Sequence, residues 1–214
     1  MKNWTRTTVI AACAIFLCLI GAAVFFLLPH SLPVVEATRN QPTGEALVAR
    51  GEYLTTAADC AACHTTKDGR PFAGGLPFKL PFGTIYSSNI TPDTEHGIGA
   101  WSAAEFVRAV KSGVGRHGED LYPAFPYTSY TLLSDDDVLA IYAYLKTQAP
   151  VAASAPESAL SFPFNQRWLM RGWKLLFLPG SDMRSDPSRD ARWNRGPILW
   201  RRWRIAGNAI RRAA

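Results

Sequence analysis

Residues 59–65, "DCAACHT", decide how this chain folds, because they hold two closely spaced thiols beside an imidazole. Cys60 and Cys63 are separated by two residues, and His64 follows directly. Cys-x-x-Cys-His is the attachment pattern of c-type haem. The two thiols add across the vinyl groups of the porphyrin, and the imidazole becomes the proximal iron ligand. The sequence therefore predicts one covalent haem c, attached through Cys60 and Cys63, with His64 bound to the iron.

Two other uses of the motif fit less well. A structural zinc site needs four ligands, and the spare histidines expected near the motif, His96 and His117, lack paired spacing. A thioredoxin-type redox pair belongs in a βαβ context, and no strand pattern of that kind surrounds the motif. The other two cysteines, Cys13 and Cys18, are expected to be apolar lining of a hydrophobic run.

Three segments around the motif have helical patterns. Residues 45–58 have apolar positions at helical spacing just before the motif. Residues 102–113 begin with a capping box and end at a glycine, and residues 134–147 also begin with a capping pattern. The connecting segments 74–83 and 122–127 are rich in Pro and Gly and are predicted to be loops. We expect an all-α domain over residues 45–148, wrapped on the haem.

The N-terminus has a long uncharged run. Residues 9–28 are apolar, and Lys2 and Arg6 precede them. Twenty helical residues span roughly 30 Å, the thickness of a bilayer core. The basic flank predicts a cytoplasmic N-terminus, with the rest of the chain on the other side. Residues 1–28 are interpreted as a transmembrane anchor, with a cleaved signal peptide as the alternative, and residues 29–44 as a linker.

The positive charge is unevenly distributed. Residues 1–166 contain 11 Lys and Arg against 14 Asp and Glu, whereas residues 167–214 contain 12 against 3. The net charge of +6 therefore arises entirely from the C-terminal part. This distribution argues against nucleic acid as a partner.

Several segments together resemble a known family. They include "RGEYLTTAADCAACHT" (50–65), "GIGAWSAAEFVRAVKSG" (97–113) and "PFNQRWLMRGWKLLF" (163–177). Over residues 45–199 the chain resembles the first haem module of cytochrome c subunits from membrane-bound bacterial alcohol, aldehyde and gluconate dehydrogenases. The resemblance implies a small class I-like cytochrome c fold and an electron carrier that is not itself an enzyme. It also implies a dehydrogenase catalytic subunit as electron donor, and ubiquinone or another cytochrome as acceptor. The expected location is the inner membrane, with the haem domain facing the periplasm.

The sixth iron ligand is left open by one departure from this family. Many relatives have methionine where this chain has Phe125, which cannot coordinate iron. Met170 is the remaining methionine candidate, and His96 and His117 are weaker ones. An open sixth position would suit an alternative function, a haem-based sensor or small-ligand-binding domain. Trp101 and Tyr86 are candidates for hydrogen bonds to haem propionates, although ordinary core packing is the competing interpretation.

Residues 149–199 are interpreted as a linker followed by an amphipathic segment. Residues 149–161 are rich in Ala, Pro and Ser, which is typical of a linker. In the following segment, Arg167, Arg171 and Lys174 recur at helical spacing beside tryptophan and leucine. Such a helix could contact lipid headgroups, dock on the dehydrogenase partner, or pack back on the haem domain.

Residues 200–214 differ in character from everything before them. "RGPIL" (195–199) repeats "RGEYL" (50–54), yet an arginine-rich run and no cysteine follow. Residues 199–212 can be encoded so that one added base yields Leu-Val-Glu-Ala-Leu-Ala-His-Cys-Gly-Glu-Cys-His-Ser-Pro, a second haem motif. We interpret residues 200–214 as an out-of-frame, unstructured tail, with a selected basic tail as the alternative.

Overall fold

The computed structural model describes residues 2–35, 41–178 and 188. The chain divides into two compact units, Met1–Ser31 and Leu32–Ala214. The predicted tail at 200–214 lies outside the described residues. The helices and strands, in chain order, are α1 Lys2–Leu27, α2 Gly44–Ala57, α3 Cys60–His64, β1 Pro77–Leu80, β2 Gly83–Tyr86, α4 Ala103–Ser112, α5 Tyr127–Tyr130, α6 Asp135–Lys146, β3 Ala159–Leu160 and α7 Leu169–Phe177.

The first unit is the predicted apolar helix, α1. Arg6–Leu27, 22 residues, is long and apolar enough to cross a membrane. None of its most apolar window is buried within the protein. A signal sequence near an N-terminus meets the same criteria of length and composition.

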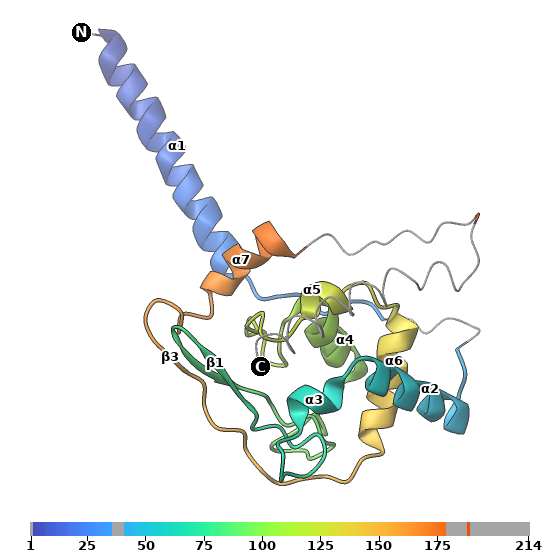
Figure 1. The fold of residues 1–214 in the computed structure, drawn as a ribbon. Helices are drawn as coiled ribbons and strands as arrows, with labels where there is room; N and C mark the ends of the chain where they lie inside the picture. The colour runs from blue at the N-terminus through green and yellow to red at the C-terminus, as the bar shows by residue number, and fades with distance from the viewer. Residues whose placement is uncertain (1, 36–40, 179–187, 189–214) are drawn as a thin grey trace. The chain divides into compact units, whose positions relative to one another are not determined.

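The core of the second unit forms where α2, α4, α5 and α6 meet. α2 packs along α6, and α4 contacts both α5 and α6 (Figure 1). Gly51 of α2 is buried against α6, so the two backbones approach closely there. The buried apolar residues are Phe72, Ile98, Phe106, Val107, Val110, Leu133, Val138, Ile141 and Leu145.

The helix boundaries follow local capping. The Ser102 hydroxyl accepts a hydrogen bond from the Glu105 N–H, and the Glu105 carboxylate accepts one from the Ser102 N–H. This reciprocal pair satisfies two donors that a helix N-terminus leaves free. Gly113 ends α4 in the left-handed region, with φ at 61°. The Ser134 hydroxyl caps α6 by accepting from the Asp137 N–H. These predicted helices are confirmed.

The prediction of an all-α domain omitted a small sheet. Residues 74–83 were expected to be a loop, but β1 and β2 form an antiparallel hairpin, with Pro77 opposite Tyr86 and Leu80 opposite Gly83. β3 pairs antiparallel with β2 through Leu160 and Gly83. Strands of four and two residues, with Pro77 at the start of β1 and Pro81 in the turn after it, are too short to show an alternating pattern. The fold is mostly helical, with this three-stranded sheet at one side.

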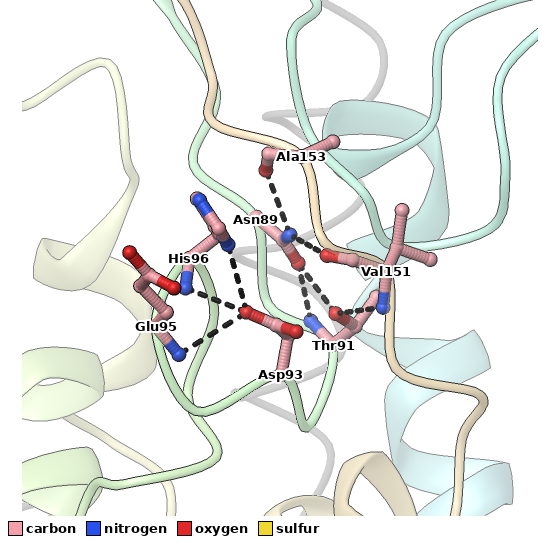
Figure 2. A network of polar contacts seen from close by, with 7 residues as sticks. All are labelled: Asn89, Thr91, Asp93, Glu95, His96, Val151 and Ala153. Atoms are coloured by element: carbon pink, nitrogen blue, oxygen red, sulfur yellow. Dashed lines mark hydrogen bonds and ion pairs between the residues drawn. The ribbon is translucent and has the colours of Figure 1, made fainter.

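Residues 149–161, called the strap below, connect α6 to the sheet. Their composition predicts a linker, but in the structure the strap runs round the outside of the unit to β3 (Figure 1). The Asn89 side-chain amide donates to the Val151 and Ala153 carbonyls at 2.8 and 3.0 Å (Figure 2). The Thr91 hydroxyl donates to Asn89 Oδ1 and accepts from the Val151 N–H. These hydrogen bonds fix the strap to the loop that follows β2.

Candidate functional site

The three residues of the sequence motif lie on one short helical turn. α2 ends at Ala57, and Asp59 adopts a left-handed conformation, with φ at 51°, before α3 begins at Cys60. Cys60 and Cys63 are three residues apart in this helix, so their side chains share one face. Both thiols have intermediate exposure. The structure therefore brings both thiols and His64 together at one place.

These residues lie on the wall of a cavity of about 340 Å³. The helices contribute Phe106 and Val110 from α4 and Ile141 and Leu145 from α6. The hairpin and the loop before α5 contribute a further group of lining residues, including Phe78, Ile85, Tyr86, Tyr122 and Phe125. A mostly apolar cavity with a few polar groups is typical of a site for a small molecule or cofactor. Its size and apolar lining suit a flat hydrophobic group attached at the two cysteines.

His64 is oriented by a backbone carbonyl. Its Nδ1 lies 2.6 Å from the carbonyl oxygen of Ser88. A carbonyl can only accept, so the proton is on Nδ1 and Nε2 keeps its lone pair. Desolvation lowers the pKa of His64, and the Ser88 hydrogen bond partly opposes this. The ring is thus a neutral imidazole with one available nitrogen, the form in which histidine binds metals.

The alternative metal and redox interpretations gain no support. Among the described residues, no group of three or more His, Cys, Asp and Glu side chains is placed to hold a metal ion by itself. Burial, and to a lesser extent the nearby Asp59 carboxylate, raises the pKa of the Cys63 thiol. Reactive cysteines of thioredoxin-type pairs have a lowered pKa instead. The chemistry of this donor set fits a porphyrin that brings its own iron.

The candidates for the sixth iron ligand are placed differently. Phe125 lines the cavity and packs against Tyr130, with ring centroids 5.4 Å apart. His96 also lines the cavity, and its Nδ1 lies 3.0 Å from the Asp93 carboxylate (Figure 2). Met170 lies on α7 and His117 in the loop after α4, and neither is among the described residues that line the cavity. The structure therefore does not bring Met170 to the site.

Trp101 and Tyr86, the two candidates for hydrogen bonds to haem propionates, both line the cavity. Trp101 also packs against the core, and its carbonyl accepts a hydrogen bond from the Tyr142 hydroxyl at 2.6 Å. Tyr86 lies at the end of β2, and its N–H donates to the Ser158 hydroxyl of the strap. Core packing is therefore observed for Trp101.

Sequence reasoning missed three contributors to the site. Ser88 acts through its backbone carbonyl, which no side-chain pattern reveals. Ser158, in the strap, and Arg167, beyond it, line the cavity although they lie far from the motif in sequence. The basic character of Arg167 was visible, but it was interpreted as part of a basic stripe.

α7 packs back on the unit through Lys174. Its ammonium group donates to the Asp120 carboxylate and to the Gly113 carbonyl, each at 2.6 Å. Lys174 and Asp120 are both only 8% exposed. Burial lowers the pKa of Lys174, and the hydrogen bond to Asp120 opposes this. One of the three alternatives for this segment, packing against the domain, is therefore observed, while Leu175 and Leu176 stay exposed.

Comparison with known proteins agrees with this geometry. The sequence profile of the family described as Cytochrome c matches residues 48–149. The chain is 53% identical to a nicotinate dehydrogenase subunit from Pseudomonas putida over 154 residues, which are 72% of this chain and 13% of that protein. It is 49% identical to the gluconate 2-dehydrogenase cytochrome c subunit of Pantoea cypripedii over 144 residues, 67% of this chain and 33% of that protein.

A third relative is the fructose dehydrogenase cytochrome subunit of Gluconobacter japonicus. It is 42% identical over 172 residues, which are 77% of this chain and 35% of that protein. The chain thus spans between 13% and 35% of the length of these three relatives. Taken with the Cys-x-x-Cys-His turn on the cavity wall, these matches show that residues 48–149 are a cytochrome c domain and that the chain is homologous to cytochrome c subunits of bacterial dehydrogenases.

Proposed function

We propose that this chain is an electron-carrying cytochrome that holds one haem c in the cavity. Cys60 and Cys63 would form the two thioether bonds, and His64 Nε2 would bind the iron. The observation that carries this proposal is the joint position of both thiols and the Ser88-bound imidazole on one wall of an apolar cavity. When bound, haem c supplies a one-electron iron couple.

The surrounding residues would set the reduction potential of the haem iron. The Ser88 carbonyl accepts the Nδ1 proton of His64, which fixes the ring and makes it a stronger donor. Apolar neighbours such as Phe106 and Leu145 exclude water and lower the local dielectric. A low dielectric disfavours the more highly charged state of the iron, and so favours reduction.

The electron donor would be the catalytic subunit of a dehydrogenase, as the names of the relatives suggest. The acceptor would be a quinone or another cytochrome. In this proposal the chain carries electrons and leaves the substrate chemistry to the catalytic subunit. α1 would anchor residues 45–148 to the inner membrane on its periplasmic side, with residues 29–44 as the connection. Intact mass measurement of the mature protein separates an uncleaved anchor from a removed signal peptide.

We also propose that the sixth iron position lacks a methionine ligand. Phe125 lines the cavity at the position where the family resemblance implies methionine, and Met170 does not line the cavity. This arrangement is what motivated the alternative of a sensor or ligand-binding domain. The homology to dehydrogenase subunits favours electron transfer. Fast, tight binding of carbon monoxide to the ferrous protein, without reduction by a dehydrogenase, would instead support the alternative.

Haem attachment is tested by expressing the full chain in bacteria that have the cytochrome c maturation machinery. The wild-type protein should show a pyridine haemochrome spectrum of haem c and the added mass of one porphyrin. Cys60→Ala and Cys63→Ala should each lose one thioether bond, which shifts that spectrum. Cys13→Ala and Cys18→Ala are matched controls on α1 and should change neither result. A colourless wild-type protein at its bare polypeptide mass would refute the proposal.

Electron transfer is tested in membranes that contain the haem-loaded protein. A quinol or an active dehydrogenase with its substrate should reduce the haem, and an added electron acceptor should reoxidise it. A haem that is attached but exchanges electrons with neither would contradict the carrier function.

A further inference from the structure

Arg167 is placed differently from the other basic residues in the part of the chain that the structure describes. Among the described residues that line the cavity, it is the one lysine or arginine. It also lies beyond residues 48–149, the part of the chain that the cytochrome c family profile matches. A residue from outside the matched domain therefore brings a permanent positive charge to the wall of a mostly apolar cavity.

Two contacts hold the guanidinium group there. Nη1 donates to the backbone carbonyl of Asp120 at 3.3 Å. The guanidinium carbon lies 5.0 Å from the centroid of the Tyr122 ring, and Tyr122 itself lines the cavity. Both contacts leave the charge of Arg167 uncompensated, because neither partner is an anion.

The carboxylate of Asp120 pairs with Lys174. Asp120 Oδ1 lies 2.6 Å from Lys174 Nζ, and Arg167 contacts only the backbone carbonyl of Asp120. Within residues 2–35, 41–178 and 188, no ion pair of Arg167 is found, either with Asp120 or with Asp59, the acidic residue on the cavity wall. An arginine carries five N–H donors, so most of them are available to a ligand.

We propose that Arg167 binds a propionate carboxylate of the haem, an inference that rests on the proposed function. Haem carries two propionates at one edge of an otherwise apolar ring. A guanidinium group forms paired, charge-assisted hydrogen bonds with a carboxylate. The segment after the strap then completes the haem site and offsets a negative charge close to the iron.

The consequence is a change in reduction potential. A positive charge near the haem stabilises the reduced state, which carries one positive charge fewer than the oxidised state. Arg167→Gln should therefore shift the equilibrium between the two states by about three- to tenfold toward the oxidised form. For a one-electron couple this corresponds to a potential lower by about 28–59 mV. Arg167→Lys should keep most of the potential, because it keeps the charge.

The experiment compares Arg167→Gln and Arg167→Lys with Arg70→Gln in the full-length, haem-loaded protein. Arg70 and Arg167 are both exposed, but Arg70 does not line the cavity, so it controls for the loss of one surface charge. Midpoint potentials come from spectroelectrochemical titration, and haem content comes from the pyridine haemochrome spectrum. A lower potential in Arg167→Gln alone, with normal haem content, supports the proposal.

Equal potentials in wild type, Arg167→Gln and Arg70→Gln, with normal haem content, would overturn it. A second measurement applies even when Arg167→Gln does not retain haem. Resonance Raman bands of the propionate groups should shift between wild type and Arg167→Lys, because an ammonium group cannot form the paired contact. Unchanged bands would also overturn the proposal. Absence of haem from the wild-type protein is a separate result, and it would instead refute the proposed function.

Discussion

Replacement of Gly51 by alanine tests how α2 is held against α6. A Cβ at this position would lie 2.7 Å from the Ala140 carbonyl carbon, 2.8 Å from Tyr144 Cβ, and closer still to the Ala140 carbonyl oxygen. Ordinary contacts begin at 3.4 Å, so the helices would have to separate by about 1 Å, which forfeits much of their dispersion energy. Overpacking of this kind costs about 3 kcal/mol when backbone atoms are the obstacle.

The intrinsic preference of a helix for alanine acts in the opposite direction. Alanine in a helix interior is favoured over glycine by about 1 kcal/mol. The net loss expected for Gly51→Ala is therefore about 2 kcal/mol, or a fall in the unfolding temperature of about 4–8 °C for a unit of the size of Leu32–Ala214. Because α2 leads directly into α3, part of the loss should appear as altered haem absorbance before global unfolding.

The assay is thermal and denaturant unfolding of the haem-loaded protein, followed by far-ultraviolet circular dichroism and by haem absorbance. Ala49→Leu is the matched control, since it adds volume on the exposed face of the same helix. It should change stability by less than about 0.5 kcal/mol. An unfolding temperature for Gly51→Ala equal to or above that of wild type would mean that helix propensity outweighs the close approach, and would refute the reasoning.

Other substitutions test the remaining parts of the site and the helices that surround it. Lys174→Met should cost about 3–5 kcal/mol, because it removes the ammonium group that pairs with the buried Asp120 carboxylate. Urea unfolding measures this loss, and an added Asp120→Asn change should recover part of it. Phe125→Met should raise the reduction potential and weaken carbon monoxide binding, because it offers a thioether to the iron; an unchanged potential and affinity would show that residue 125 does not face the metal. Ser102→Ala should cost about 1 kcal/mol through loss of the α4 cap, and a thermal shift below about 2 °C would contradict this. The Ser102 N–H lowers the pKa of Glu105 in the folded protein. Glu105 therefore contributes its full stabilisation at pH values above its ordinary pKa of 4.5. This stabilisation is lost as the pH falls below that value. Glu105→Gln should reduce the loss of stability with falling pH in unfolding experiments at about pH 3–6. An unchanged pH dependence would count against the hydrogen bond between Ser102 and Glu105.

Features set by neighbouring residues were predictable from the sequence. The helices from Ser102 and Ser134 follow the capping patterns because serine hydroxyls satisfy backbone donors three residues ahead. The Cys-x-x-Cys-His turn needs only one helical turn to bring both thiols together. In each case the signal and the structure lie within a few residues of each other.

Features set by distant contacts were not predictable. The hairpin is stabilised by β3, more than 70 residues later in the chain, and its short strands lie among prolines that are typical of turns. The strap has the composition of a linker because its hydrogen bonds to Asn89 use backbone carbonyls, which every residue possesses. The partner of His64 is a backbone carbonyl for the same reason. The position of Arg167 on the cavity wall depends on the path of the strap that precedes it.

The path of the strap also decides where the chain can be cut when this haem domain is transferred into another protein. Residues 48–149 match the family profile, but a piece cut at residue 149 would lose one strand, two acceptors of the Asn89 amide, and two residues of the cavity wall. The unit that can be transplanted runs at least to Phe177, because Lys174 ties α7 to the loop after α4. A chimaera joined after α7 should therefore keep its haem environment, whereas one joined after α6 should not.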